Sequence, residues 1–114
     1  MINRRTAGHN FERKLAEELR ELGFHRCQTS RYASREKDDQ GVDFVNTEPF
    51  SIQAKRWSSA PSYHEVLKSM PEESTENMNI ILHRRPNKGD VAVLSKRSVY
   101  LLMYVFNEWK KGHK

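Results

Sequence analysis

The sequence predicts an α/β sandwich in which helices pack on a mixed central sheet. Its apolar pattern changes repeatedly between helical spacing and short apolar runs, and the expected order is α-β-β-β-α-β-β-α. Strands bracketed by helices are typical of helices layered on one sheet. A chain of 114 residues suits one domain, since domains cluster near about 100–150 residues. We therefore expect a single domain over residues 1–114.

The first helix is expected to follow a loose, flexible basic tail over residues 1–9. Asn10 is a suitable N-cap and Gly23 a suitable residue just after the helix. One apolar stripe recurs at spacings of four, four and three residues: Phe11, Leu15, Leu19 and Leu22. This spacing predicts an amphipathic helix.

Three strands are expected next, over residues 24–29, 42–45 and 50–57. Residues 30–41 are polar and end in glycine, so they are expected to form a loop. Asn-Thr-Glu-Pro at residues 46–49 has the composition of a turn. The second and third strands are therefore predicted to pair as an antiparallel hairpin.

The second half predicts a short helix, a second hairpin and a last helix. Pro61 can begin the short helix, because proline is tolerated at a first helical position. Strands are expected over residues 79–83 and 91–94, joined by a turn at residues 86–90. Ser95 or Ser98 caps the last helix.

The last helix, which runs through Trp109, is more apolar than a surface helix requires. Its apolar residues cover more than one stripe: Tyr100, Leu101, Leu102, Met103, Tyr104, Val105, Phe106 and Trp109. Either the helix is wedged deep against the sheet, or it forms a two-fold dimer interface.

The composition limits the classes of function that are possible. Lysine and arginine number 20 against 15 acidic residues, which gives a net charge of +5 and suits a polyanionic partner. The single cysteine, Cys27, excludes an intramolecular disulfide and a multi-cysteine zinc site. The longest apolar run has eight residues, 99–106, and a membrane span needs about 20. We expect a cytoplasmic protein with no membrane partner.

The sequence gives little support for a zinc site at the histidines or for a metal site at the tandem acids of residues 38–39. The histidines lack zinc-site spacing and are expected at the surface or at an edge. The tandem acids Asp38 and Asp39 are expected to be solvated loop residues.

Three polar residues form the candidate site. Side chains alternate along a strand, so Gln53 and Lys55 share one face. Asp43 joins them if the hairpin register sets it across from Gln53. A carboxylate, an amide oxygen and an ammonium suit phosphodiester hydrolysis, in which Mg²⁺ takes oxygen ligands. Glu12, at the edge of the first apolar stripe, is the natural second carboxylate.

These residues resemble a known family. A glutamate on an N-terminal helix, then Gly41-Val42-Asp43-Phe44, a turn, and a strand ending Gln53-Ala54-Lys55 is similar to the PD-(D/E)xK nucleases. The layout resembles their archaeal-type and phage-type Holliday junction resolvases.

The resemblance implies a restriction-endonuclease-like αβββαβ core and a metal-dependent endonuclease. It implies metal ligation by Glu12, Asp43 and the Ala54 carbonyl, and catalysis by Lys55. It also implies a serine before the aspartate, placed at Ser34 with Ser30 as a rival.

Gln53 departs from the family, which usually has an acid two residues before the lysine. An amide can still coordinate through its oxygen, but the site has one negative charge fewer. We expect Mg²⁺ as cofactor, with Mn²⁺ able to substitute.

Basic residues flank the candidate site, and such residues dominate affinity for nucleic acid. The predicted DNA contacts are Arg4, Arg5, Arg31, Arg35, Lys37, Arg56 and Trp57. Trp57 either stacks on a base or closes the sheet edge.

The leading hypothesis is a homodimeric Holliday junction resolvase that cuts four-way DNA in the cytoplasm, in the host if phage-encoded. The dimer follows from the resemblance and the apolar last helix. Two alternatives stay open: a restriction-like or nicking nuclease of the same fold, and a non-catalytic DNA-binding relative with a decayed site.

Overall fold

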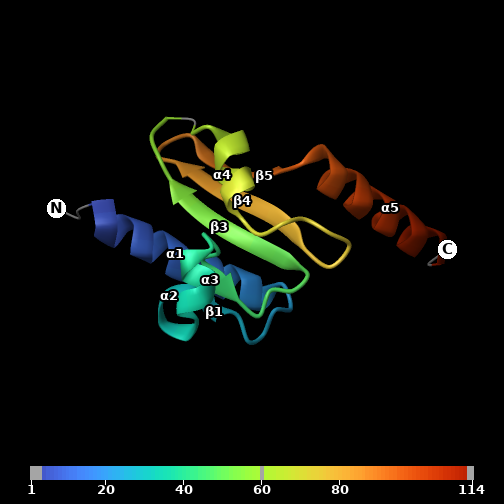
Figure 1. Ribbon diagram of the computed structural model, residues 1–114, viewed down its shortest axis with the longest axis horizontal. Coiled ribbons are helices and arrows are strands. Elements are labelled where there is room, and N and C mark those ends of the chain that lie inside the picture. Colours follow the sequence, from blue (N-terminus) through green and yellow to red (C-terminus); the bar gives the residue numbers. More distant parts are fainter. Residues whose placement is uncertain (1–3, 60, 113–114) are drawn as a thin grey trace.

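A computed structural model describes residues 4–59 and 61–112, apart from the side chains of Arg4 and Tyr32. Helices and strands are interspersed along the chain (Figure 1). Their bounds are α1 Arg4–Glu21, β1 Gln28–Thr29, α2 Ser30–Ala33, α3 Arg35–Asp39, β2 Phe44–Val45, β3 Phe50–Arg56, α4 Tyr63–Ser69, β4 Met78–Arg85, β5 Gly89–Leu94 and α5 Lys96–Gly112.

The main sheet has the spatial order β3-β4-β5. β3 and β4 run parallel, and α4 forms the crossover between them. β4 and β5 form the expected antiparallel hairpin, in which Asn87 (φ 66°) and Gly89 (φ 111°) shape the turn. This mixed sheet with flanking helices is consistent with the restriction-endonuclease-like core that the resemblance implies.

The first predicted hairpin is not formed as a strand ladder. β2 pairs antiparallel with β1 in a separate two-stranded sheet, with Thr29 opposite Phe44. One backbone hydrogen bond still joins the β2 segment to β3, from the Asp43 N–H to the Ile52 carbonyl (2.8 Å). The predicted ladder is absent because β2 is only two residues long and forms its strand pairing with β1 instead.

The first helix begins earlier than expected. Residues 4–9 belong to α1 rather than to a loose tail, since extending a nucleated helix costs little and Gly8 does not break it. Residues 1–3 of the predicted tail lie outside the described residues. The helix ends at Glu21, and Gly23 (φ 122°) follows it as predicted, with the Phe24 N–H bonded to the Leu19 carbonyl (3.1 Å).

Two segments between α1 and β3 differ from expectation. Residues 24–27 form turns, so the strand expected over 24–29 is reduced to β1. The expected loop at 30–41 contains α2 and α3. Ser34 caps α3 by accepting from the Lys37 N–H (3.3 Å). Such short helices have too few turns to display an apolar stripe in the sequence.

The core lies between α1 and one face of the sheet. Its buried apolar residues come from α1, β2, β3 and the turn before β1: Phe11, Leu15, Ala16, Leu19, Cys27, Phe44 and Ile52. This packing fixes α1 and the β2 segment beside β3, where the candidate site residues are found.

α5 extends away from the sheet instead of being wedged against it (Figure 1). It begins after Ser95, whose hydroxyl accepts from the Ser98 N–H (3.2 Å), as one predicted cap requires. Most of its large apolar side chains are exposed, so the deep-packing interpretation is wrong for this chain alone. Among the described residues, no helix has the length and apolarity needed to cross a membrane.

Candidate active site

Asp43 is fixed against β3 by two hydrogen bonds. Its N–H donates to the Ile52 carbonyl (2.8 Å), and its Oδ2 accepts from the Ala54 N–H (2.7 Å). These bonds flank Gln53. Asp43 therefore lies across from Gln53, as the predicted register required, although no regular hairpin is present.

Burial sets the protonation of Asp43. Desolvation raises its pKa from 3.8 to about 6, although the Ala54 hydrogen bond and the charge of Lys55 both lower it. The negative charge of Asp38 also raises the pKa of Asp43. A carboxylate held in this way gains from any added positive charge beside it.

Glu12 reaches the same region from α1. The pKa of Glu12 is raised from 4.5 to about 7, mainly by burial and then by the negative charge of Asp43, while Arg31 and Lys55 act in the opposite direction. Arg31 Nη2 forms an ion pair with Glu12 Oε2 at 2.9 Å. Glu12 lines the same cleft as Ala54 and Lys55, and the Ala54 N–H bonds to Asp43, so two carboxylates from distant parts of the sequence face a shared region.

Gln53 contributes an oxygen with no hydrogen-bond partner. Within the described part of the chain, its Oε1 is the buried side-chain polar atom left without one. Its Nε2 would lie 3.4 Å from a Cβ added at Gly41, so Gly41 (φ 75°) packs closely over this amide. A buried oxygen left unpaired costs about 1–3 kcal/mol, which a cation at this point would offset.

Lys55 lies beside an aromatic group. Its Nζ is 4.7 Å from the centre of the Trp57 ring, and that ring meets His83 edge-on at 6.4 Å. His83 is buried, with Nδ1 2.9 Å from the Tyr63 hydroxyl and Nε2 3.1 Å from the Trp57 carbonyl. His83 therefore holds Trp57 in place through two contacts, one with its ring and one with its backbone carbonyl.

The burial of His83 contradicts the expectation of a surface or edge histidine. Its position at the end of the apolar run Asn79-Ile80-Ile81-Leu82, within β4, was the available signal. Both of its ring nitrogens have polar partners, so it acts as a support for the strand end that carries Lys55 and Trp57.

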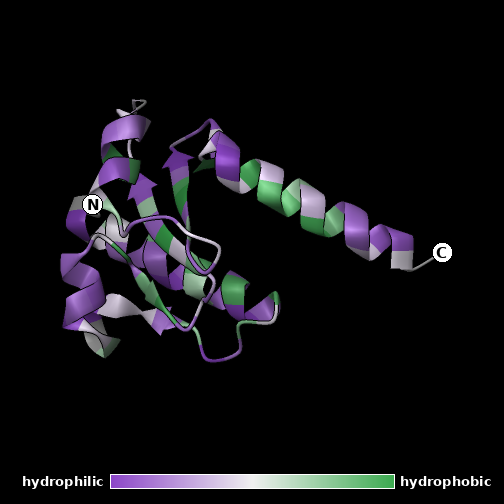
Figure 2. Cartoon of the chain, turned by 45° about the vertical axis from the view of Figure 1, so that its right-hand side comes forward, coloured by the Kyte–Doolittle hydropathy of each residue, from purple (hydrophilic) through white to green (hydrophobic). Residues whose placement is uncertain are grey.

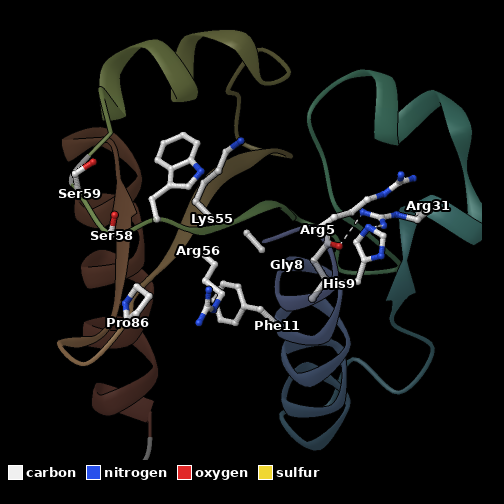
Figure 3. Close-up of a pocket in the computed structure, with 13 residues that line it drawn as sticks. Arg5, Gly8, His9, Phe11, Arg31, Lys55, Arg56, Ser58, Ser59 and Pro86 are labelled. Atoms are coloured by element: carbon white, nitrogen blue, oxygen red, sulfur yellow. Dashed lines mark hydrogen bonds and ion pairs between the residues drawn. The ribbon is translucent and has the colours of Figure 1, made fainter. Parts of the chain in front are cut away.

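A cleft of about 630 Å³ opens over these residues. Figure 3 shows Lys55 and Arg56 on the β3 side, with Arg5, His9 and Arg31 across the cleft. Its walls also include Glu12, Ala54, Trp57, Ser58, Ser59 and Pro86. Four of the predicted DNA contacts, Arg5, Arg31, Arg56 and Trp57, are thus gathered in one cleft with Lys55.

The other predicted DNA contacts do not line this cleft. Arg35 and Lys37 lie on α3, where they pair with Asp39 and Glu48, each at 3.9 Å. The side chain of Arg4 lies outside the described part of the structure. Arg31 also differs from expectation, since it pairs with Glu12 and contacts His9. That ion pair joins α1 to α2, and sequence spacing gave no signal for it.

The two candidate serines have different surroundings. Ser34 accepts from Lys37 N–H as the cap of α3, and its catalytic role stays a prediction. Ser30, the rival, is fully buried and donates to the Val42 carbonyl (2.6 Å), next to Asp43. Its hydroxyl also lies 3.5 Å from Asp38. Asp38, expected to be only solvated, therefore belongs to the electrostatic surroundings of the site.

The candidate donor set fits a hard divalent cation. Among the residues that the structure describes, no three histidine, cysteine, aspartate or glutamate side chains form a metal-binding group. The candidate set has two carboxylates, Glu12 and Asp43, the unpaired Gln53 oxygen and the Ala54 carbonyl. Mg²⁺ is commonly held by one or two carboxylates, with waters and substrate phosphates as its other ligands.

The protein has a mixed α/β core, and its site combines partly buried carboxylates with a lysine beside a basic cleft. This combination is typical of nucleases. The sequence model of a restriction endonuclease family, Mrr_cat, matches residues 3–70. This is more than half of the chain and includes all four candidate residues named above. The chain belongs to this restriction endonuclease family, within the PD-(D/E)xK superfamily.

Membership implies an endonuclease that hydrolyses DNA phosphodiester bonds. The match supports the restriction-like alternative better than the resolvase hypothesis. No curated protein and no solved structure matches the chain.

Proposed function

We propose that this chain cuts DNA with a divalent metal ion held by Glu12, Asp43, Gln53 and the Ala54 carbonyl, and with Lys55 as the catalytic lysine. The main support is the buried Gln53 Oε1, which has no hydrogen-bond partner among the described residues; Gln53 stands between Ile52 and Ala54, the two residues to which Asp43 bonds. A cation at this point would pair with that oxygen and would favour the charged carboxylates of Glu12 and Asp43. Membership of the endonuclease family supports the same chemistry.

Hydrolysis adds water across a phosphorus–oxygen bond. The water oxygen bonds to phosphorus, the bond to one DNA strand end breaks, and the leaving oxygen takes up a proton. A bound divalent ion lowers the pKa of water and offsets charge on the phosphoryl oxygens. The ammonium of Lys55 stabilises the same charge by donating hydrogen bonds. Arg56 and Arg5 hold flanking phosphates across the cleft.

The DNA substrate within this class has two candidates. Family membership favours linear duplex, as expected for a restriction-like nuclease. The resemblance to resolvases favours a four-way junction, which needs paired cuts from a symmetric dimer. Gln53 keeps a third possibility open, a DNA-binding protein that does not cut, because the site has one acid fewer than is usual.

One assay distinguishes these functions. Labelled linear duplex and a matched four-way junction are incubated with the protein in Mg²⁺, in Mn²⁺ and in EDTA. We expect metal-dependent cutting that EDTA abolishes. The Lys55→Ala variant should bind DNA without cutting it, while Lys68→Ala, an exposed lysine on α4, serves as the matched control.

Each outcome has a defined meaning. Cutting of duplex supports the restriction-like function, and paired cuts confined to the junction support the resolvase function. Binding without cutting in either metal would establish the non-catalytic relative. Cutting in EDTA would refute the metal site.

A further inference from the structure

Trp57 lies at the cleft with its ring beside the ammonium of Lys55. The Lys55 Nζ is 4.7 Å from the centre of the indole ring, a distance at which a cation is attracted to the ring face. Both residues line the cleft, and Trp57 is 37% exposed. Base stacking and closure of the sheet edge, the two roles that the sequence leaves open for Trp57, do not account for this contact.

The backbone of Trp57 is held on both sides by β4. Its N–H donates to the Arg84 carbonyl (3.1 Å), which continues the pairing of β3 with β4 beyond the end of β3. Its carbonyl lies 3.1 Å from Nε2 of His83. A carbonyl oxygen can only accept, so Nε2 carries a proton and donates. The position of Trp57 is therefore fixed although it lies just outside the strand.

The ring of Trp57 is also held by His83. The two rings meet edge-on, with their centres 6.4 Å apart and their planes at 65°, which is a favourable aromatic geometry. His83 is buried, and in its neutral form Nδ1 accepts from the Tyr63 hydroxyl at 2.9 Å. Each ring nitrogen of His83 thus has a partner, and the ring cannot turn without breaking one of these bonds.

The register of the sheet explains why these groups meet. Lys55 is directly opposite His83 in the parallel pairing of β3 with β4, so their side chains point to the same face. Trp57 follows Lys55 by two residues, and alternation places it on that face as well. The contacts therefore run from α4 through β4 to the end of β3, where they reach the lysine.

We propose that Trp57 is a positioning residue for the catalytic lysine, Lys55. His83 and Tyr63 hold the Trp57 ring where it can do this. A lysine side chain is flexible, and a donor that is aimed in advance stabilises phosphoryl charge without having to reorganise. The indole face limits the positions that the ammonium can take. Positioning of Lys55 matters for cutting only if Lys55 is catalytic, so the proposal rests on the proposed function.

The first test measures the position of Lys55 without any cutting. Protons held over an aromatic face are shielded, so the Cε protons of Lys55 should resonate upfield in a ¹H–¹³C spectrum of the DNA-free protein. Lys55→Arg identifies the signal by its loss. Trp57→Leu should abolish the shift, and Trp57→Phe should retain part of it. Lys96, whose Nζ is 5.5 Å from the Tyr100 ring on α5, is the internal control, because its signal should stay unchanged. An unshifted Lys55 signal in wild type would overturn the proposal.

The second test measures single-turnover cutting at saturating DNA and Mn²⁺, on the substrate that wild type cuts. Trp57→Leu should lower the rate about tenfold, as expected for the loss of a cation–π contact, and leave the Kd for DNA unchanged. Trp57→Phe should recover part of the rate, since it keeps a ring face. Trp109→Leu is the matched control, because Trp109 lies on α5, which projects from the body (Figure 2), and does not line the cleft.

A third variant, His83→Gln, tests the support of the ring. Glutamine keeps an N–H that can donate to the Trp57 carbonyl but lacks the ring that the indole contacts. We expect a Lys55 shift and a cutting rate between those of wild type and Trp57→Leu. Urea unfolding checks folding, and Tyr63→Phe, which removes the hydroxyl partner of Nδ1, replaces His83→Gln if that variant is unfolded. A shift and a rate equal to those of wild type would refute the role of His83.

The results distinguish failed positioning from a failed nuclease assignment. If Lys55→Ala still cuts, the proposed function is refuted, and the spectrum alone then decides whether Trp57 holds Lys55. If Lys55→Ala is inactive but Trp57→Leu cuts at the wild-type rate, only the positioning role is refuted. Loss of DNA affinity in Trp57→Leu with an unchanged saturated rate would assign Trp57 to base stacking and overturn the proposal.

Discussion

Replacing Asp43 by asparagine should make the metal-free protein more stable at neutral pH while abolishing cutting. Asparagine keeps an oxygen that can accept from the Ala54 N–H, the bond that Asp43 makes at 2.7 Å, and it removes the buried charge. The pKa of Asp43 rises from 3.8 to about 6 on folding. At about 1.4 kcal/mol per unit, the charged form costs the folded state roughly 3 kcal/mol.

The sign follows from proton binding. Between about pH 4 and pH 6 the folded wild type holds a proton at Asp43 that the unfolded chain has released. The stability from this group is therefore fully present below about pH 4 and is lost as the pH rises through 6. The Asp43→Asn variant lacks this loss. Its advantage should be absent near pH 4 and reach up to about 3 kcal/mol above pH 6.

Urea unfolding in EDTA at a series of pH values measures this difference. Asp39→Asn is the control, since Asp39 is an exposed partner of Arg35 at 3.9 Å and such pairs contribute about 0–1 kcal/mol. Added Mn²⁺ or Mg²⁺ should then stabilise wild type and leave Asp43→Asn unchanged, because only the wild type keeps both carboxylates. A variant no more stable than wild type at pH 8 would refute the burial argument. Equal stabilisation of both by metal would refute the ligand assignment.

The remaining predictions concern DNA binding, the metal and packing. Arg56→Ala should reduce the slope of log K against log salt by about 0.9, whereas Arg35→Ala, outside the cleft, should not; equal effects in a titration would place the DNA elsewhere. Cutting should be stronger in Mn²⁺ than in Mg²⁺ at equal low concentration, and Gln53→Glu should lower the Mg²⁺ needed; if Gln53→Ala cuts like wild type, the amide is not a ligand. Phe44→Ala removes a fully buried ring and should cost about 3–5 kcal/mol in urea unfolding. Gly41→Ala, at φ 75° and against Gln53, should cost about 1–2 kcal/mol from the backbone alone and reduce cutting; an unchanged variant would show that this close packing is unimportant.

Local signals predicted the ends of elements where one residue controls them. Gly23 ends α1 because its positive φ suits glycine, and Ser95 caps α5 through its hydroxyl. Alternation along β3 predicted that Gln53 and Lys55 share one face, but it left the register of Asp43 against Gln53 as a condition. These features depend on neighbours in sequence, which a single chain displays directly.

Features that depend on distant contacts were not predictable. The pairing of β2 with β1 depends on which of two edges a two-residue strand uses, and a strand of that length has no periodicity. The ion pair of Arg31 with Glu12 requires α1 and α2 to be adjacent in space. The polar partners of His83 come from distant parts of the chain, the Tyr63 hydroxyl from α4 and the Trp57 carbonyl just after β3.

The position of β3 at the edge of its sheet has a consequence for solubility. An edge strand exposes unpaired N–H and C=O groups, which can recruit a strand from another molecule. Here Asp43 satisfies both kinds of group: its N–H bonds to the Ile52 carbonyl, and its carboxylate accepts from the Ala54 N–H. The same residue proposed to bind the metal thus protects this edge from pairing with another chain. Loss of its side-chain acceptor would leave the Ala54 N–H open and favour aggregation, whereas loss of its charge alone would not.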